Sequence, residues 1–265
     1  MTTSPSSRAV RQYSTTSDNL TARIAIHAFG TNAQDWSSWL EERLPLAGRV
    51  LEVGAGTGRL WQRVDHAARG LRLTLTDFSL AMCEQLTRVP GAEVLRCDAA
   101  ALPFRDASFD TVIANHMLYH LDDPDVALRE FARVLRPGGQ LAVAVNGRDH
   151  LAELNAIGPA IGRPDANVGA YNNDFTAENG PARVGRHFTD VAVDSYPGDL
   201  AVPTSEPLLA YLASIVDEPL TAQQRAAARQ YVQIEIDARG AFHVRKHTVL
   251  ITAHQGGRPQ GRPPS

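Results

Sequence analysis

Three glycines at alternate positions follow a short apolar run, and this feature most limits what the chain can fold into. The run reads Arg49-Val-Leu-Glu-Val-Gly-Ala-Gly-Thr-Gly58. Because glycine has no Cβ atom, such a loop can turn sharply and let a ligand approach the backbone. We predict a buried strand, the loop, and a helix that starts near Arg59, with free N–H groups suited to a carboxylate or phosphate. A purely structural turn is the alternative interpretation.

Two common glycine loops do not fit this sequence. The dinucleotide spacing G-x-G-x-x-G, counted from Gly54, requires glycine at position 59, where the chain has Arg59. The nucleoside-triphosphate loop G-x-x-x-x-G-K-[ST] is also absent from the chain. The loop therefore favours a ligand other than a nicotinamide dinucleotide or a nucleoside triphosphate.

Short β-branched runs alternate with helical segments through the middle of the chain. Strands are predicted at residues 49–53, 71–76, 93–97, 111–115 and 140–145, and helices at residues 79–87 and 125–135. The second helix is followed by Arg136-Pro-Gly-Gly139, where we expect a turn back into a strand. This alternation predicts a parallel sheet with right-handed crossovers.

The flanking regions have a different pattern. Two short helices, broken near Gly30, are expected within residues 20–44, and the basic stretch His243-Val-Arg-Lys-His247 is interpreted as the outward face of a strand. Beyond Asn146 we predict helices at 150–161, 206–216 and 221–238, and strands at 188–196 and 242–253. The predicted divisions are a flexible leader (1–17), an N-terminal helical lid (18–47), a ligand-binding core (48–147), acceptor-pocket helices with sheet completion (148–255) and a disordered tail (256–265).

Two acidic residues end the second and third predicted strands. In doubly wound sheets, ligands bind outside the carboxyl ends of the strands. Asp77 could accept hydrogen bonds from ribose hydroxyls, although it could instead cap the helix that starts at Ser79. Asp98 could accept a hydrogen bond from an adenine amino group, while Ala99 leaves its N–H free for a ring nitrogen. Glycines, Asp and Asp at three consecutive strand ends predict a nucleoside site.

Composition excludes several classes of protein. The formal net charge is −3, which argues against a dedicated nucleic-acid surface. No apolar run approaches the roughly twenty residues that span a bilayer, and Met1 to Ser17 lacks the apolar core of a secretory signal. Cys83 and Cys97 are too few for a disulfide framework and lack metal-ligand spacing. We expect a cytoplasmic protein with no metal, no membrane and no nucleic-acid partner.

The motifs together resemble the class I S-adenosylmethionine-dependent methyltransferases. The resemblance is close over residues 48–146 and looser over the N-terminal helices. The matching segments are Glu52-Val-Gly-Ala-Gly-Thr-Gly58, Asp77-Phe-Ser79, Cys97-Asp-Ala99, Leu102-Pro-Phe104, Ser108-Phe-Asp-Thr-Val112, Ala114-Asn-His-Met-Leu-Tyr-His120 and Arg133-Val-Leu-Arg-Pro-Gly-Gly139.

The resemblance implies a fold and an activity. The fold would be α/β: a doubly wound, Rossmann-like, seven-stranded and mostly parallel sheet with an antiparallel last strand, plus an N-terminal helical lid and C-terminal cap helices. The natural candidate for the antiparallel strand is 242–253. With S-adenosyl-L-methionine as cofactor, a monomer or homodimer would methylate an O, N or C nucleophile of a small-molecule acceptor by in-line displacement, in the manner of natural-product tailoring enzymes. The alternatives are a methyltransferase of protein or RNA and a non-catalytic cofactor-binding module.

The resemblance also implies roles for particular residues. The methionine part of the cofactor would lie against Glu52, Gly54, Ala55, Gly56 and Gly58. The nucleoside would be held by Asp77 at the ribose, Phe78 and Met82 along the adenine, and Asp98 and Ala99 at its edge. The remaining cofactor candidates are Asn115 and His116 beside the reactive methyl group, and Tyr13, Thr31 and Asn32 from the lid.

The segment after the fourth predicted strand is the place to look for a general base. His116 and His120 carry a side chain that ordinarily titrates near neutrality and are the catalytic candidates, although His120 could instead orient the cofactor. Candidates for acceptor contacts are Tyr119, Asn146 and His150, with core packing as the alternative for Tyr119. The tetrapeptide [D/N]-P-P-[Y/F] of amino-group methylation is replaced by Asn115-His-Met-Leu118, which disfavours nucleic-acid amino methylation.

Overall fold

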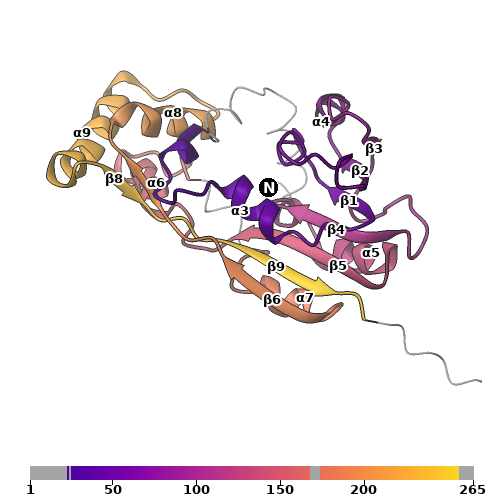
Figure 1. The fold of residues 1–265 in the computed structure, drawn as a ribbon. Helices are drawn as coiled ribbons and strands as arrows, with labels where there is room; N and C mark the ends of the chain where they lie inside the picture. The colour runs from indigo at the N-terminus through magenta and orange to yellow at the C-terminus, as the bar shows by residue number, and fades with distance from the viewer. Residues whose placement is uncertain (1–22, 24, 168–173, 257–265) are drawn as a thin grey trace, which may run out of the picture.

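A seven-stranded sheet forms the centre of the computed structural model (Figure 1), which describes residues 23, 25–167 and 174–256. The strand order is β3-β2-β1-β4-β5-β9-β6. The strands are β1 (Arg49–Val53), β2 (Arg72–Asp77), β3 (Glu93–Arg96), β4 (Phe109–Asn115), β5 (Leu135–Asn146), β6 (Thr189–Ser195) and β9 (Thr248–His254). The predicted leader, Tyr13 and most of the predicted tail lie outside the described residues.

The direction of the strands follows the predicted topology. β3, β2, β1, β4 and β5 are parallel, whereas β9 runs antiparallel between β5 and β6. β9 is paired along its length on both sides, from Asn146↔Thr248 to Gln140↔His254 with β5 and from Ser195↔Val249 to Thr189↔His254 with β6. The prediction of a Rossmann-like, mostly parallel sheet with an antiparallel last strand is confirmed.

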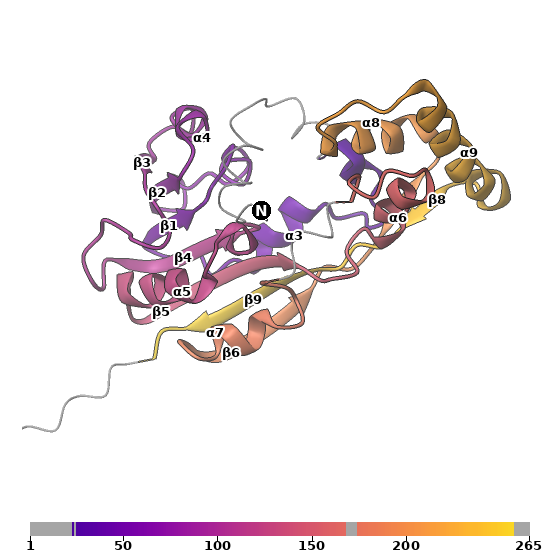
Figure 2. The same ribbon diagram turned by 180° about the vertical axis from the view of Figure 1, so that it is seen from behind.

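Helices cover both faces of this sheet because its strands are apolar on both faces (Figures 1 and 2). Along β1, Val50 packs on one side, while Leu51 and Val53 pack on the other, as the two-residue period of a strand requires. The Val50 side carries α3 (Trp36–Arg43) and α4 (Leu80–Leu86), and the Leu51 side carries α5 (Pro124–Val134) and α7 (Gly180–Val184).

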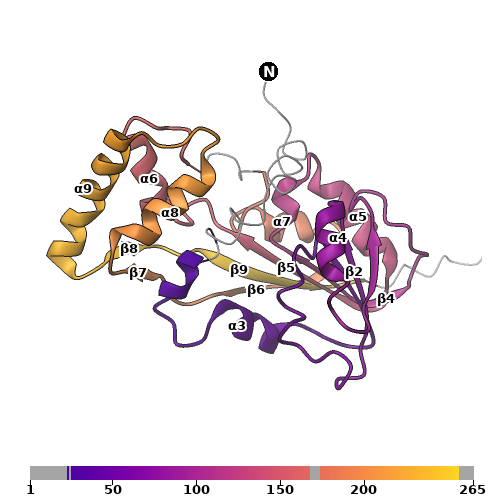
Figure 3. The same ribbon diagram turned by 90° about the horizontal axis from the view of Figure 1, so that it is seen from above.

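A second lobe has its own apolar core and lies beyond one end of the sheet, as Figure 3 shows. The lobe consists of α6 (Ala152–Ala160), α8 (Ser205–Ile215), α9 (Ala222–Arg239) and a two-stranded antiparallel sheet of β7 (Leu200–Val202) and β8 (Phe242–Val244). The 3₁₀ helix η1 (Ile26–Phe29) inserts Ile26 into the same core. We call this unit the cap lobe.

Local sequence signals explain where the longer helices begin and end. Asp123 accepts a hydrogen bond from the N–H of Asp125 and so caps α5. Thr221 and Gln224 form a reciprocal capping box at the start of α9, and Gly240 ends that helix in the left-handed conformation. These signals agree with the predicted helices at 125–135 and 221–238.

Three local predictions were wrong. Residues 57–63 after the glycine loop form hydrogen-bonded turns, with bonds to Gly58 and Leu60, instead of a helix. Strand β5 begins at Leu135 and runs through the expected turn, because Leu135 pairs with Phe109 before a register shift. The predicted strand 242–253 is two strands, since Arg245–His247 leave β8 for β9. Strand β7 and helix α7 were not predicted, and no helix in the described residues is long and apolar enough to cross a membrane.

Gly158 offers a test of how α6 packs in the cap lobe. A Cβ atom at Gly158 would lie 2.3 Å from the carbonyl oxygen of Ala166 and 2.7 Å from that of Arg163, both backbone atoms that cannot yield cheaply. We therefore expect Gly158→Ala to lower the free energy of unfolding by about 1–3 kcal/mol, measured by urea denaturation. The control is Gly185→Ala, whose Cβ would meet its nearest atom at 3.4 Å. Equal stability of both variants with the native protein would contradict this packing.

Candidate cofactor and acceptor site

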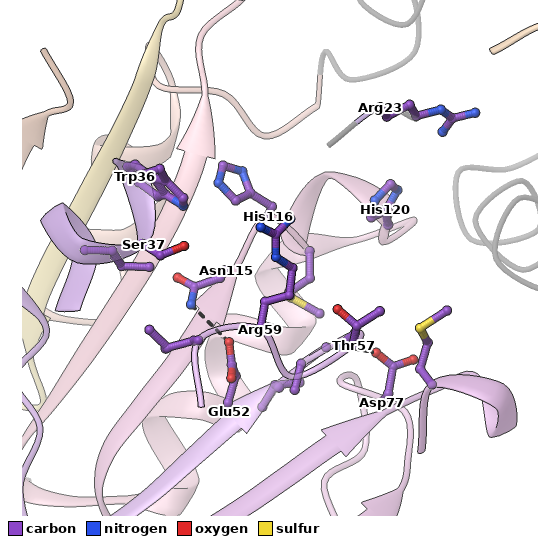
Figure 4. A pocket seen from close by; sticks show the side chains of 18 of the residues that line it. Arg23, Trp36, Ser37, Glu52, Thr57, Arg59, Asp77, Asn115, His116 and His120 are labelled. Carbon is purple, nitrogen blue, oxygen red and sulfur yellow. Dashed lines mark hydrogen bonds between the residues drawn. The ribbon is translucent and has the colours of Figure 1, made fainter. Parts of the chain in front are cut away.

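A cleft of about 1810 Å³ lies at the carboxyl ends of the parallel strands and continues to the cap lobe. Its walls come from the glycine loop after β1, the ends of β2, β3 and β4, helix α3 and the segment between β8 and β9. Glu52, Asp77, Asn115 and His116 all line this cleft (Figure 4). Ligand binding at this edge is typical of doubly wound sheets.

The glycine loop presents bare backbone to the cleft. Gly54 and Gly56 have φ angles of 67° and 57°, the left-handed region in which a side chain is strained. A Cβ atom on Gly56 would meet no atom within 4 Å, so this residue leaves open space for a ligand. Ala55 also lines the cleft. Gly58 is different, because it is buried and faces Leu86 beneath the loop.

Asp77 ties the glycine loop to the next helix. Its Oδ2 accepts a hydrogen bond from the N–H of Gly56 at 3.0 Å, and its Oδ1 accepts one from the N–H of Ser79 at 2.8 Å. The alternative role, support of the helix start, is therefore part of what Asp77 does. Each carboxylate oxygen keeps a lone pair for a ribose hydroxyl, and burial raises the pKa of Asp77.

Glu52 is buried beneath the loop and holds the side chain of Asn115. Only 3% of Glu52 is exposed, and its two oxygens accept hydrogen bonds from Trp61 Nε1 at 2.5 Å and from Asn115 Nδ2 at 3.0 Å (Figure 4). Burial raises the pKa of Glu52 to about 7. This bond leaves Asn115 Oδ1 buried without a hydrogen-bond partner in the described structure. An orphaned acceptor beside a carboxylate fits the ammonium group of the methionine part of the cofactor.

The adenine candidates lie farther along the same cleft. Phe78 is 51% exposed and Met82 is buried, and both side chains line the cleft. The guanidinium of Arg96 lies 5.7 Å from the centre of the Phe78 ring and donates a hydrogen bond to the Phe78 carbonyl. Asp98 Oδ1 accepts a hydrogen bond from the N–H of Ala100, and Ala99 is buried beside it.

His116 occupies a strained position at the end of β4. Its φ angle is 54°, which a non-glycine residue rarely adopts, and its N–H bonds to the carbonyl of Ala144 at 2.9 Å. The imidazole lies 5.5 Å from the Trp36 ring, measured between ring centres. Burial lowers the pKa of His116 and of His120 to about 4 each, so both are neutral at pH 7. The expectation that they titrate near neutrality is corrected in this structure.

The two described cofactor candidates of the predicted lid, Thr31 and Asn32, bond to the segment between β6 and β7. Thr31 exchanges hydrogen bonds with the backbone of Asp199, and Asn32 donates a hydrogen bond to the carbonyl of Pro197 at 2.9 Å. Asn32 lines the cleft, whereas Thr31 is not among its lining residues. The bonds of Thr31 therefore account for it as a structural link, and its cofactor role stays a prediction.

The acceptor candidates Tyr119, Asn146 and His150 all line the cleft, as does the catalytic candidate His120. Trp36, Arg59 and Lys246 also line the cleft and were not among the predicted site residues, whereas Tyr196 belongs to the segment in which the acceptor pocket was expected. Arg59 was used only to exclude dinucleotide binding, and Lys246 lies in the basic stretch that was interpreted as an outward strand face. A usable signal was present for Lys246, because it is the single lysine in a chain with 25 arginines.

Fold and site together define a class of protein. The strand order, an antiparallel β9 between β5 and β6, a glycine loop after β1 and an acid at the end of β2 form the nucleoside-binding core of a class I methyltransferase. The Methyltransferase domain family (Methyltransf_11) matches residues 51–143, which include the glycine loop, Asp77 and the end of β4, and the recognition of this stretch as a class I S-adenosylmethionine-dependent methyltransferase domain is confirmed.

Characterised relatives differ in what they act on. The chain is 43% identical to the demethylmenaquinone methyltransferase of Renibacterium salmoninarum over 97 residues. This aligned stretch covers 36% of this chain and 40% of that protein. It is 33% identical to the phosphatidylethanolamine N-methyltransferase of Cereibacter sphaeroides over 138 residues, which make up 49% of this chain and 66% of that protein. The matches thus span less than two thirds of the length of these relatives.

A similar fold also occurs in a protein that is named for another reaction. The [4+2]-cyclase SpnF superposes with a TM-score of 0.58 at 21% identity, covering 97% of this chain and 98% of that one. At 21% sequence identity, structural similarity indicates a shared fold and not a shared reaction. The reaction of this protein must therefore be inferred from its site residues.

Removal of the Asp77 carboxylate should abolish cofactor binding. S-adenosylhomocysteine at a hundredfold excess over its Kd should stabilise the native protein by about 2.7 kcal/mol, read as a rise in Tm. Asp77→Ala should remove this rise, because the ribose acceptor and the anchor of Gly56 are lost together. Asp123→Ala, which removes a comparable carboxylate at the start of α5 and outside the cleft, should retain it. An unchanged rise in Asp77→Ala would remove Asp77 from the site.

Proposed function

We propose that this protein transfers the methyl group of S-adenosyl-L-methionine to a nucleophile of a small-molecule acceptor. The observation that carries the proposal is the buried, unpartnered Oδ1 of Asn115, a residue that lines the cleft and whose amide Glu52 holds in place, together with the open backbone of Gly56. Asp77 lies along the same cleft, where the ribose would follow. These groups match the ammonium, carboxylate and ribose of the cofactor in order.

The residues of this chain would contribute mainly by orienting the cofactor and the acceptor. The bound cofactor supplies a methyl group made electrophilic by its sulfonium. Glu52 and Asn115 would fix the methionine part from the ends of β1 and β4, so that the methyl group faces the acceptor side of the cleft. Alignment of this kind contributes about 7–11 kcal/mol to barrier reduction. The rings of Trp36 and Tyr196, 5.4 Å apart at their centres, would exclude water from that side.

His116 would orient the acceptor rather than act as a strong base. Its pKa of about 4 keeps the imidazole neutral and able to accept a hydrogen bond at pH 7, but makes the ring a weak proton acceptor. The role therefore suits an acceptor that is already ionised or is easily ionised. O, N and C acceptors are all compatible with this arrangement.

The acceptor side favours a small molecule, and we place the protein among enzymes that tailor natural products. The cleft lies between the strand ends and the segment that carries η1 and α3, and the net charge is −3, which disfavours a nucleic-acid acceptor. Cys83 and Cys97 are free thiols, which fits a reducing cytoplasm. A protein or RNA acceptor, and a non-catalytic cofactor-binding module, are the competing functions.

The most direct test uses purified protein, labelled S-adenosylmethionine and a cell lysate, which is separated after the reaction into small-molecule, protein and RNA fractions. Mass spectrometry should detect small molecules that gain one labelled methyl group. Label appearing only in the protein or RNA fraction would favour a macromolecular acceptor. Binding of S-adenosylhomocysteine without turnover on any fraction would favour the non-catalytic module.

His116→Ala should separate binding from turnover. We expect the affinity for S-adenosylhomocysteine to be retained and kcat to fall about 10- to 100-fold, because a hydrogen bond to the acceptor is lost. In the native protein, kcat should decrease as the pH falls through about 4, because the His116 imidazole becomes protonated at its lowered pKa and can no longer accept a hydrogen bond. His243→Ala, outside the cleft on β8, is the control. Full turnover by His116→Ala would exclude this role.

A further inference from the structure

Lys246 is placed where an acceptor would lie. It is the single lysine of the chain and belongs to the short link between β8 and β9, which joins the cap lobe to the central sheet. Its side chain lines the cleft together with His27, His116 and His150. The other basic positions of the chain are arginines, which are permanently charged, so the only amine side chain faces the cleft.

The ammonium group of Lys246 lacks an anionic partner in the part of the chain that the structure describes. Its Nζ atom lies 4.2 Å from the centre of the Tyr196 ring, a cation–π contact. No hydrogen bond or ion pair within 4.0 Å reaches this Nζ from any described residue; Asp199 accepts from the backbone N–H of Lys246 instead, at 2.9 Å. A half-buried ammonium group that contacts an aromatic ring and has no carboxylate within ion-pair distance is suited to bind an anionic ligand.

The backbone on both sides of Lys246 is fixed. The N–H of Arg245 bonds to Glu153 Oε2 at 2.8 Å, and the Arg245 side chain pairs with Asp149. On the other side, the carbonyl of His247 accepts a hydrogen bond from Gly147 at 2.9 Å. Lys246 is therefore presented by an anchored link, which limits the positions that its ammonium can reach.

Two further donors lie on the same wall. His150 Nδ1 accepts a hydrogen bond from the N–H of His247 at 3.1 Å, and burial holds the pKa of His150 well below its usual value. The neutral ring therefore carries its proton on Nε2, for which the described residues provide no acceptor. Asn146 Oδ1 accepts from Thr248 Oγ1 at 2.9 Å, which leaves the Asn146 amide N–H groups as donors.

Two carboxylates act on Lys246 from neighbouring elements. Asp199 before β7 and Asp35 at the start of α3 favour the charged ammonium, but Asp35 is already bonded to Ser37 and Ser38 and paired with Arg63. His116 at the end of β4 and His150 before α6 are neutral at pH 7. Burial lowers the pKa of Lys246 to about 8, so the amine is mostly charged at pH 7 and would gain from an anion.

We propose that Lys246, with His150 and Asn146, receives an oxyanion of the acceptor, so that the substrates are small organic acids with a carboxylate or an ionised hydroxyl group. This inference rests on the proposed function and adds the chemical class of its acceptor. Amines and other cationic acceptors are disfavoured at this wall, because an ammonium ligand would meet a like charge and three donors.

The single lysine permits a direct test in the whole protein. Reductive methylation with ¹³C-formaldehyde labels only Lys246 and the α-amino group, and the methylated lysine keeps its charge. With the protein saturated by S-adenosylhomocysteine, benzoate and 4-nitrophenolate should shift the Lys246 resonance and raise its titration midpoint, whereas benzamide and benzylamine should not. A response to benzoate alone identifies a carboxylate, and a response to 4-nitrophenolate alone identifies an ionised hydroxyl.

Variants measured by calorimetry complete the test. Lys246→Met should weaken binding of the responding acid roughly tenfold or more, as expected for loss of a charged hydrogen bond, and retain S-adenosylhomocysteine. Lys246→Arg should restore most of the affinity. Arg148→Met removes an exposed positive charge two residues from His150 and outside the cleft, and should change little. Acid affinity of the native protein should fall as pH rises from 7 to 9.

The inference is overturned by any of three results. In the first, Lys246→Met and the native protein bind the acids with equal affinity. In the second, benzamide or benzylamine binds more tightly than either acid. In the third, the Lys246 resonance responds to neither acid. Such results with intact binding of S-adenosylhomocysteine overturn only the acceptor class. Loss of S-adenosylhomocysteine binding by the native protein would instead overturn the proposed function.

Discussion

The buried carboxylate of Glu52 is the interaction on which the site depends. A carboxylate out of contact with water is costly unless donors compensate it, and here the two donors come from different parts of the fold, Trp61 after the glycine loop and Asn115 at the end of β4. The same two bonds therefore stabilise the charge and fix the geometry. They hold the first turns after the loop against the sheet, and they determine which face of the Asn115 amide meets the cleft.

The cleft exists because two separately packed units face each other across the end of the sheet. The central sheet is covered on both faces, and the cap lobe buries its own apolar side chains around Leu154, Leu212 and Val232. Few apolar contacts are needed between them, so the space can be lined by polar and aromatic groups that bind ligands. Part of the lining comes from the glycine loop and the ends of the parallel strands, and the rest from α3, η1 and residues next to the cap lobe such as His150 and Lys246.

Regular features of the sheet could be predicted from sequence, whereas irregular connections could not. Strand β1 and helices α4 and α5 follow from periodicity and from capping residues such as Asp123. Asp77 was predicted because parallel strands end at a shared edge, whereas Asn115 and His116 were implied by the resemblance to the methyltransferase family. Lys246 and Trp36 come from segments whose approach to the cleft depends on tertiary packing. The lowered pKa of His116 was missed for the same reason, since burial by distant segments has no local sequence signal.

The position of β9 has a consequence for how the chain reaches its native state. Among the described residues, β6 bonds to the sheet only through β9, which is the later of the two strands in sequence and lies between β5 and β6. During synthesis, β6 has no neighbour to bind until the whole cap lobe segment and residue 254 have been made. Because contacts between such distant segments form slowly, this half of the sheet exposes an unpaired edge to other chains during folding, and residues 196–247 must be synthesised before the edge is closed.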